Sequence, residues 1–205
     1  MAIEVKKSTK LIDYDVAHKL LYKRVKDVIN GKKPELLWIL EHKPIFTAGT
    51  SSKENEILNK TIRVLKTSRG GRITYHGPGQ KVVYFVLNLN ERGRDIRKLI
   101  KHIENCIIKI LKEYGIKSFA DNKNIGIWVN DNGTAKKVAA IGIRVERWIA
   151  FHGFSINISN DLEVYKNIVP CGIYNKGVTN LCSIKENKYK YISQKIINNF
   201  LRIFK

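Results

Sequence analysis

Residues 69–80 read Arg69-Gly-Gly-Arg-Ile-Thr-Tyr-His-Gly-Pro-Gly-Gln80, and the interpretation of the whole chain depends on this stretch. Its glycines and proline are typical of a loop, yet a β-type run, Ile73 to Tyr75, lies directly before His76. Adjacent glycines such as Gly70 and Gly71 allow a backbone to approach a ligand closely. The segment is therefore a phosphate-binding loop, a basic nucleic-acid-binding loop, or the wall of a pocket for a neutral group.

The phosphate-loop interpretation is weak. Such a loop has the pattern GxxxxGK[ST], in which backbone N–H groups and the lysine hold phosphates. Gly71 and Gly77 have the right spacing, but Pro78 replaces the lysine and removes an N–H donor. A GxGxxG dinucleotide pattern is absent from this stretch. The pocket wall is the better hypothesis, with His76 either touching a ligand or bracing the loop as a structural histidine.

The length and composition indicate one catalytic domain over residues 1–205, because domains commonly have about 100–200 residues. The chain is 43% apolar, without a run long enough to span a membrane or an apparent secretory signal. Cys106, Cys171 and Cys182 are odd in number and lack CxxC spacing, which argues against a disulfide framework or a metal site. We expect a soluble cytoplasmic protein, by default a monomer.

The net charge of +20 favours a polyanionic partner, which could be nucleic acid, anionic lipid or an acidic protein. The lysines are spread along the chain rather than gathered in a tail, so general compositional drift is the alternative explanation. No nucleic-acid-binding motif accompanies the charge. An acidic protein partner explains its sign equally well.

Hydrophobic periodicity predicts helices over 13–30, 94–114 and 189–204. It also predicts strands over 35–42, 63–67, 81–89, 125–129, 136–145 and 148–158, with an Asn-Gly hairpin turn at 131–133. In the first helix, the residues expected on the buried face are Val16, Ala17, Leu20, Leu21, Val25, Val28 and Ile29. Without βαβ alternation, the fold class is α+β, with a mixed or antiparallel sheet flanked by helices.

Cys171 is a candidate nucleophile because it lies between Pro170 and Gly172, in a turn that can expose its sulfur. The reactive form is the thiolate, so a base must be near. The possible bases are His18, His42, His76, His102, His152 and, less usually, Lys137. Small apolar residues after Lys137 would bury the amine, and burial favours the neutral form that accepts a proton. The alternatives are an inert cysteine and an exposed lysine at the start of a strand.

Six segments together resemble the lipoyl(octanoyl) transferases, the octanoyltransferases of protein lipoylation. They occur in the family's order, at residues 41–49, 69–80, 137–145, 152–157, 170–172 and 177–181. Two positions depart from the family pattern: Asn180 stands where serine is frequent, and Thr50-Ser-Ser-Lys53 follows Gly49 where arginine is common.

The resemblance implies a biotin/lipoate protein ligase-like catalytic core over about residues 30–205. On it, Cys171 matches the acyl-accepting nucleophile and Lys137 the residue that activates it. The positions that match the family's acyl-binding segments are Arg69, Gly70, Gly71, Arg72, Ile73, Thr74, Tyr75, His76, Ala140, Ile141, Gly142, Gly153, Phe154 and Ser155.

The implied reaction moves an octanoyl group from octanoyl-acyl carrier protein through a Cys171 thioester to one lysine of a lipoyl domain. Acceptors would be 2-oxoacid dehydrogenase subunits or the glycine cleavage H protein. No ATP, metal or other cofactor is expected, since the donor's phosphopantetheine thioester supplies the driving force. The alternatives are an ATP-dependent lipoate–protein ligase on the same fold and, more distantly, a basic nucleic-acid-binding module.

Overall fold

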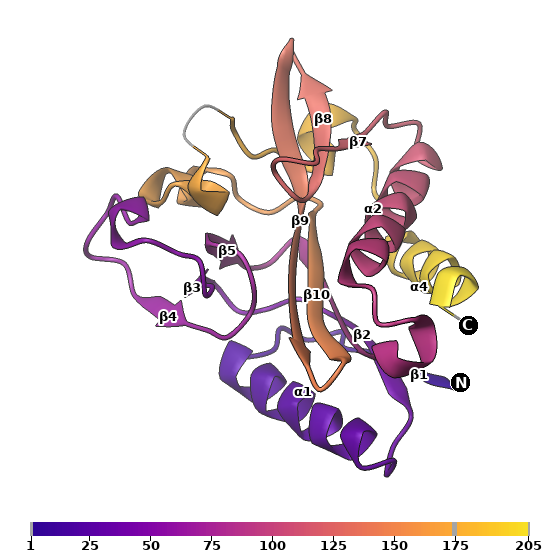
Figure 1. Cartoon of the computed structure of the whole chain (residues 1–205). Coiled ribbons are helices and arrows are strands. Elements are labelled where there is room, and N and C mark those ends of the chain that lie inside the picture. The colour runs from indigo at the N-terminus through magenta and orange to yellow at the C-terminus, as the bar shows by residue number, and fades with distance from the viewer. Residues whose placement is uncertain (1, 174–175, 205) are drawn as a thin grey trace.

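The computed structural model describes residues 2–173 and 176–204 and has the α+β architecture expected from the sequence (Figure 1). A seven-stranded sheet has the order β1-β2-β6-β10-β9-β8-β7, in which β1 and β2 are parallel and the other neighbours antiparallel. In that order its strands are Ile3–Lys7, Glu35–Leu40, Gln80–Asn88, Ile149–Asn157, Thr134–Glu146, Ile127–Asp131 and Phe119–Ala120.

A second, three-stranded sheet has the order β4-β3-β5, with strands Val64–Lys66, Ile45–Ala48 and Ile73–His76. The helices are α1 (Tyr14–Ile29), α2 (Ile96–Lys112), α3 (Leu181–Ile184) and α4 (Ile192–Phe204). Short 3₁₀ turns span Glu54–Glu56, Leu89–Arg92, Glu163–Asn167 and Pro170–Gly172. No helix in the described ranges combines the length and apolar character needed to cross a membrane.

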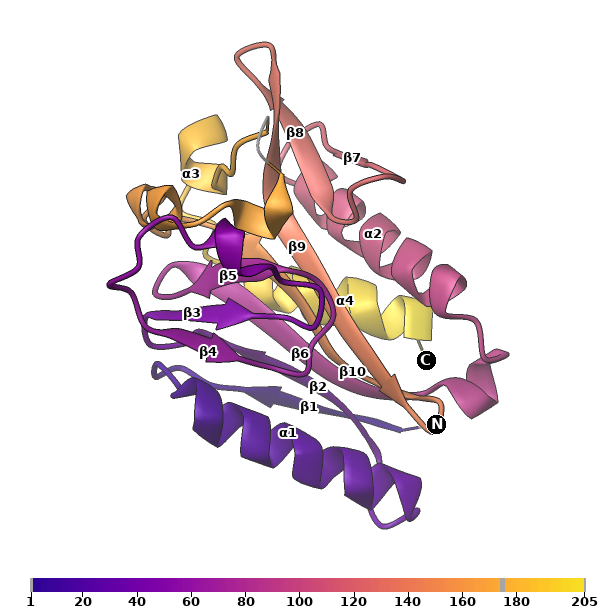
Figure 2. The ribbon, with the colours of Figure 1, turned by 60° about the vertical axis from the view of Figure 1, so that its left-hand side comes forward.

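The large sheet separates two layers (Figures 1 and 2). Helices α2 and α4 pack on one face and bury the main core, which includes Phe85, Ile103, Ile107 and Phe200. Helix α1 covers the first half of the opposite face around a second core, and the small sheet lies beside it. The space between the small sheet and the large one contains the site described below.

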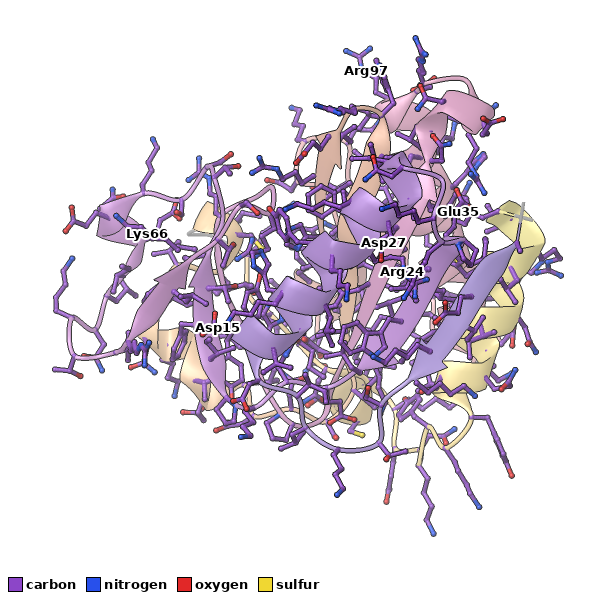
Figure 3. All side chains as sticks on the ribbon, turned by 90° about the horizontal axis from the view of Figure 1, so that it is seen from below. Asp15, Arg24, Asp27, Glu35, Lys66 and Arg97 are labelled. Atoms are coloured by element: carbon purple, nitrogen blue, oxygen red, sulfur yellow. The ribbon has the colours of Figure 1, made fainter. Side chains whose placement is uncertain are left out.

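Helix α1 shows where periodicity misled the prediction. Ala17 and Leu21 are buried as expected, but Val16 and Leu20 are 51% and 44% exposed. A helix that packs on a flat sheet buries only a narrow stripe of its surface. Val16 and Leu20 each lie about 100° around the helix axis from the buried residue that follows them, and so fall outside this stripe. On the side facing the sheet edge, Arg24 pairs with Glu4 at 2.8 Å (Figure 3).

Asn180, one of the two departures from the family pattern, has a local structural role. Its side chain accepts a hydrogen bond from the N–H of Ser183 at 2.8 Å, which caps α3, and donates one to the carbonyl of Asn160 at 2.9 Å. A serine would have to make both bonds through a single hydroxyl oxygen, whereas the amide of Asn180 uses separate oxygen and nitrogen atoms. The departure therefore affects loop anchoring.

A β-bulge decides which way Lys137 faces. Ile127 pairs with Ala139, but the next residue, Trp128, pairs with Lys137, so that Val138 is an extra residue in β9. Val138 lies in the main core, whereas Lys137 and Ala140 both border the cavity on the other face. A strictly alternating strand would place Lys137 and Ala140 on opposite faces. The bulge aligns the lysine with the cavity wall.

Strand β10 bends where it meets β6. His152 has φ +66° and Gly153 has φ +156°, both unusual inside a strand. A Cβ at Gly153 would lie 2.0 Å from the carbonyl oxygen of Val83, so that the two backbones pass closer than any side chain allows. Gly153 itself borders the cavity described below.

We therefore expect Gly153→Ala to destabilise the fold much more than Gly133→Ala. Gly133 also has positive φ (+78°), but a Cβ there would have nothing within 4 Å. Gly133→Ala therefore measures only the free-energy cost of placing alanine at positive φ. Gly153→Ala adds an overpacking cost, and its free energy of unfolding should fall by about 2 kcal/mol more than that of Gly133→Ala. Urea denaturation measures both, and equal losses would show that β10 can shift away from β6.

Candidate active site

A cavity of about 720 Å³ lies between the small sheet and the large one. It is bordered by residues from β5, β6, β9, β10 and the turn at 170–172, which are far apart in the sequence. The predicted site residues on its wall are Arg69, Gly70, Gly71, Arg72, Thr74, His76, Lys137, Ala140, Ile141, Gly142, Gly153, Phe154, Ser155 and Cys171.

Two of the predicted acyl-binding residues do not border the cavity. Ile73 and Tyr75 point into a separate small core with Tyr165 and Ile168. Successive residues of a strand face opposite sides, so Thr74 and His76 take the cavity side of β5. Direct contact of Ile73 or Tyr75 with an acyl group is thus not supported, and their role is to hold the strand.

Cys171 occupies a strained turn, as its position between proline and glycine suggested. It has φ +56° and is half-buried on the cavity wall. The N–H groups of Gly172 and Ile173 bond back to the carbonyls of Val169 and Pro170, at 3.0 and 3.2 Å. A residue without a β-branch tolerates this backbone, and such strain is concentrated at functional sites.

Glu56 anchors this turn, and nothing in the sequence pattern pointed to it. Its carbonyl accepts the N–H of Val169 at 2.7 Å, and its buried carboxylate pairs with the guanidinium of Arg72. Arg72 in turn packs against Gly172, where a Cβ would lie 2.2 Å from Nη1. Arg72 therefore lies on the cavity wall where that wall meets the Cys171 turn.

Lys137 is buried, at 6% exposure, which excludes the exposed strand-start alternative. Its Nζ donates to the carbonyl of Ile125 at 3.0 Å and lies 4.9 Å from the centre of the Trp128 ring. No carboxylate within the described ranges pairs with it. Lys137 and Cys171 also border a second, narrower space together with Thr74 and Tyr165, so two residues distant in sequence meet at one place.

Arg69 places a buried guanidinium beside the cavity without a carboxylate partner in the part of the chain that the structure describes. Thr47 holds it: Nη2 donates to the Thr47 carbonyl and hydroxyl, both at 2.8 Å. Burial lowers the pKa of Arg69, while the negative charges of ionised Tyr14 and Cys171 raise it. Arg69 and Cys171 both border this cavity.

Tyr14, Tyr84, His76 and His152 border the cavity, and His42 packs against Tyr14, Tyr84 and His76. Burial lowers the pKa of His42 to about 4 and those of His76 and His152 to about 3. The His76 ring stacks on Tyr14, and His42 bonds the hydroxyl of Tyr84 at 2.8 Å. The sequence analysis placed His76 on the pocket wall, where it lies, whereas it named His42 and His152 only as possible bases for the cysteine.

The tautomer of His76 follows from its neighbour Gln80. The Gln80 amide nitrogen donates to the Asn157 side-chain oxygen at 2.9 Å, so its own oxygen is the acceptor toward His76 Nδ1, at 2.7 Å. Nδ1 of His76 must therefore carry the hydrogen, and Nε2 keeps its lone pair. His76 braces the loop and is at the same time on the cavity wall, so the two roles proposed for it are compatible.

We expect acid to destabilise the protein through these histidines. The ordinary pKa of 6.5 applies in the unfolded chain, whereas folded His42 binds its proton only near pH 4. Between these values the unfolded state holds the extra proton, so the free energy of unfolding falls as the pH decreases, by about 1.4 kcal/mol per pH unit for each such histidine.

The variant His42→Gln isolates one of these protons. Its free energy of unfolding should fall less between pH 6.5 and 5 than that of the natural protein, by up to about 2 kcal/mol. Carboxylates that titrate in this range contribute to both proteins and cancel in the comparison. Parallel pH profiles from urea denaturation would show that folding does not lower the pKa of His42.

Comparison with solved structures identifies the class of fold. A lipoate–protein ligase A bound with ATP superimposes with a TM-score of 0.73 at 14% identity, covering 98% of this chain and 85% of that one. The bipartite lipoate protein ligase of Thermoplasma acidophilum gives 0.72 at 12% identity, covering 98% and 84%. The fold is that of the lipoate–protein ligase catalytic domains, as the sequence resemblance implied.

Sequence comparison identifies the family. Residues 13–203 match the lipoyl protein ligase A/B catalytic domain family, and the chain belongs to it. An octanoyltransferase of Anaplasma phagocytophilum is 42% identical over the full length of both chains. Those of Zymomonas mobilis and Ehrlichia chaffeensis are 42% and 44% identical, over 97% and 87% of this chain and 93% and 85% of theirs.

Proposed function

We propose that the protein is an acyltransferase that moves an octanoyl group in protein lipoylation, the activity for which its relatives are named. The observation that carries the mechanism is the meeting of Cys171 and buried Lys137 on one cavity wall. A nucleophile and a proton acceptor in one site are what covalent acyl transfer requires.

In the first step the Cys171 thiol transfers its proton to the Lys137 amine, and the thiolate attacks the carbonyl carbon of the donor thioester. A new carbon–sulfur bond forms, and the donor's carbon–sulfur bond breaks. The departing thiolate takes the proton from the Lys137 ammonium. The Cys171 S–H bond is lost and an S–H bond forms on the departing thiol. One thioester replaces another, so the exchange is nearly neutral in energy.

Two groups are suited to stabilise the oxyanion that develops during this attack. The Arg69 guanidinium is a buried positive charge that borders the same cavity as Cys171 and is fixed by Thr47. The N–H of Ile141 is the second, because β8 does not extend along this part of β9. Preorganised donors of this kind act strongly where water is excluded.

In the second step the amine of an acceptor lysine attacks the Cys171 thioester. The carbon–nitrogen bond forms, Cys171 leaves as a thiolate, and the proton lost by the amine restores the thiol, with Lys137 as carrier. Conversion of a thioester into an amide is downhill. The two half-reactions share one site, so the kinetics should be ping-pong.

The donor we propose is octanoyl-acyl carrier protein, and the acceptors are lipoyl domains of 2-oxoacid dehydrogenase complexes and the glycine cleavage H protein. The thioester supplies the energy, so the mechanism needs neither ATP nor a metal. The proposal involves no nucleic acid or membrane and treats the chain as a cytoplasmic monomer.

The alternative is an ATP-dependent lipoate–protein ligase, since a structural neighbour has ATP bound. Such an enzyme would make an acyl adenylate and would not require Cys171. A basic nucleic-acid-binding module would likewise be indifferent to Cys171. The cysteine therefore separates the three possibilities.

Replacement of Cys171 is the first test. Incubation with octanoyl-acyl carrier protein should give one octanoyl adduct by intact-mass spectrometry, and Cys171→Ser should abolish it. Cys182 is an exposed free thiol, so Cys182→Ser is a matched control that should retain the adduct. ATP-dependent acylation of a lipoyl domain by Cys171→Ser would instead establish the ligase alternative.

Replacement of Lys137 tests the proton acceptor. Lys137→Met keeps the length of the side chain but removes the amine, and the rate of adduct formation should fall about 10²- to 10⁴-fold, the usual contribution of a general base. Lys136→Met is the matched control, because the Lys136 side chain is one-third exposed and pairs with Asp131. Equal rates for the two variants would remove Lys137 from the mechanism.

The net charge of +20 suggests electrostatic steering of an acidic donor. The rate of adduct formation from octanoyl-acyl carrier protein should therefore fall as salt rises from 0.05 to about 0.5 M, where the screening length shortens to a few ångströms. A small neutral octanoyl thioester serves as the control and should lose little. The same loss for both donors would assign the charge to compositional drift.

A further inference from the structure

The cavity has an outer part that neither half-reaction described above uses. From the Lys137 region it continues around the edge of β9 toward α2 and the loop at 123–125. There it is bordered by Ile96 and Ile100 of α2 and by Ile125, and Lys123 lies at its rim. Figures 1 and 2 show α2 running beside β9 on the side away from the small sheet.

The strand edge inside this groove is open. The pairing of β8 with β9 ends at Ala139. Beyond it, the one backbone group among the described residues that bonds to this side is the N–H of Gly70, which donates to the carbonyl of Ile143 at 3.2 Å. The carbonyl of Ile143 therefore faces away from β10. In an antiparallel pair the backbone groups of every second residue face the same side, so the carbonyl and N–H of Ile141 also face away from β10, toward the open side. Within the described ranges, the N–H and the carbonyl of Ile141 make no backbone hydrogen bond to any turn or loop.

We propose that this groove binds the amide-containing arm of the thioester donor, an inference that rests on the proposed function. An open strand edge accepts an extended chain through its amides. With the thioester at Cys171, the first amide of the arm would donate to the Ile141 carbonyl. The Ile141 N–H remains free for the oxyanion, and the alkyl parts of the arm pack on Ile100 and Ile125.

The shape of the groove favours this occupant over a strand of the acceptor polypeptide. Gly70 covers the edge at Ile143, where a Cβ on Gly70 would lie 2.7 Å from the carbonyl oxygen. Only a short stretch of edge at Ile141 is therefore available, too little for a β-ladder that needs several consecutive residues. A single thin chain with widely spaced amides can pass through.

The charge at the outer end also matches such a donor, whose arm is joined to its carrier by a phosphate. Lys123 is exposed there, and Arg97, Lys98 and Lys101 are exposed on the adjoining part of α2. None of these four pairs with a carboxylate in the described ranges. Arg97 projects outward at the periphery of the molecule (Figure 3).

A series of donors tests the groove in the unaltered protein. Octanoyl-pantetheine carries two amides and octanoyl-N-acetylcysteamine carries one. The octanoyl thioester of ethanethiol carries none. The rate constant for adduct formation at Cys171, from intact-mass time courses below saturation, should fall about 3- to 10-fold from the one-amide to the no-amide donor, as expected for one net hydrogen bond. The pantetheine donor should be the fastest.

A variant of α2 tests whether the difference in rate between the donors arises in the groove. Ile96→Trp should fill the groove and bring the ratio of the pantetheine rate to the ethanethiol rate toward one. Val16→Trp is the matched control, since Val16 is also an exposed aliphatic residue, on the distant helix α1. That variant should keep the natural ratio, and circular dichroism with melting temperature verifies that both variants are folded.

The outcomes separate the groove from the chemistry. Equal rate constants for the three donors, or a natural ratio retained in Ile96→Trp, overturn the groove while leaving acyl transfer by Cys171 intact. Absence of any Cys171 adduct with every donor, including octanoyl-acyl carrier protein, overturns the proposed function and the groove together.

Discussion

A single extra residue in β9, Val138, sets the face of the sheet on which Lys137 lies. Because of it, the lysine shares the cavity wall with Ala140 and Gly142 while Val138 fills the core on the opposite side. The rest of the site is assembled around that position. Backbone bonds from Lys137 to Gly177 and Thr179, at 2.9 and 3.0 Å, join the strand to the segment that follows the Cys171 turn.

The cavity combines buried polar groups with little negative charge. The Arg69 guanidinium and the Lys137 amine both lack carboxylate partners in the described ranges, and burial keeps His42, His76 and His152 neutral near pH 7. Such an arrangement is costly for stability unless hydrogen bonds compensate it, as Thr47 does for Arg69. It is suited to stabilising negative charge on sulfur or oxygen during acyl transfer.

Local patterns predicted much of the fold. The hairpin at Asn132-Gly133, the amphipathic α2 and the turn around Cys171 all follow from short-range sequence preferences, and the structure confirms them. Helix α1 was predicted with too wide a buried face, since only tertiary packing decides how much of a helix is covered. In β5, Ile73 and Tyr75 proved to face away from the cavity, which depends on the pairing of β5 with β3.

The sequence by itself determined the class of fold, the family, and the residue types available for chemistry, because motifs such as 69–80 and 170–172 are continuous in the chain. It did not determine which groups meet. The bulge at Val138, the anchoring of the turn by Glu56 and the open edge at Ile141 each depend on contacts between distant segments. Such contacts exist only when the strands are paired, and so the active site is a property of the tertiary structure.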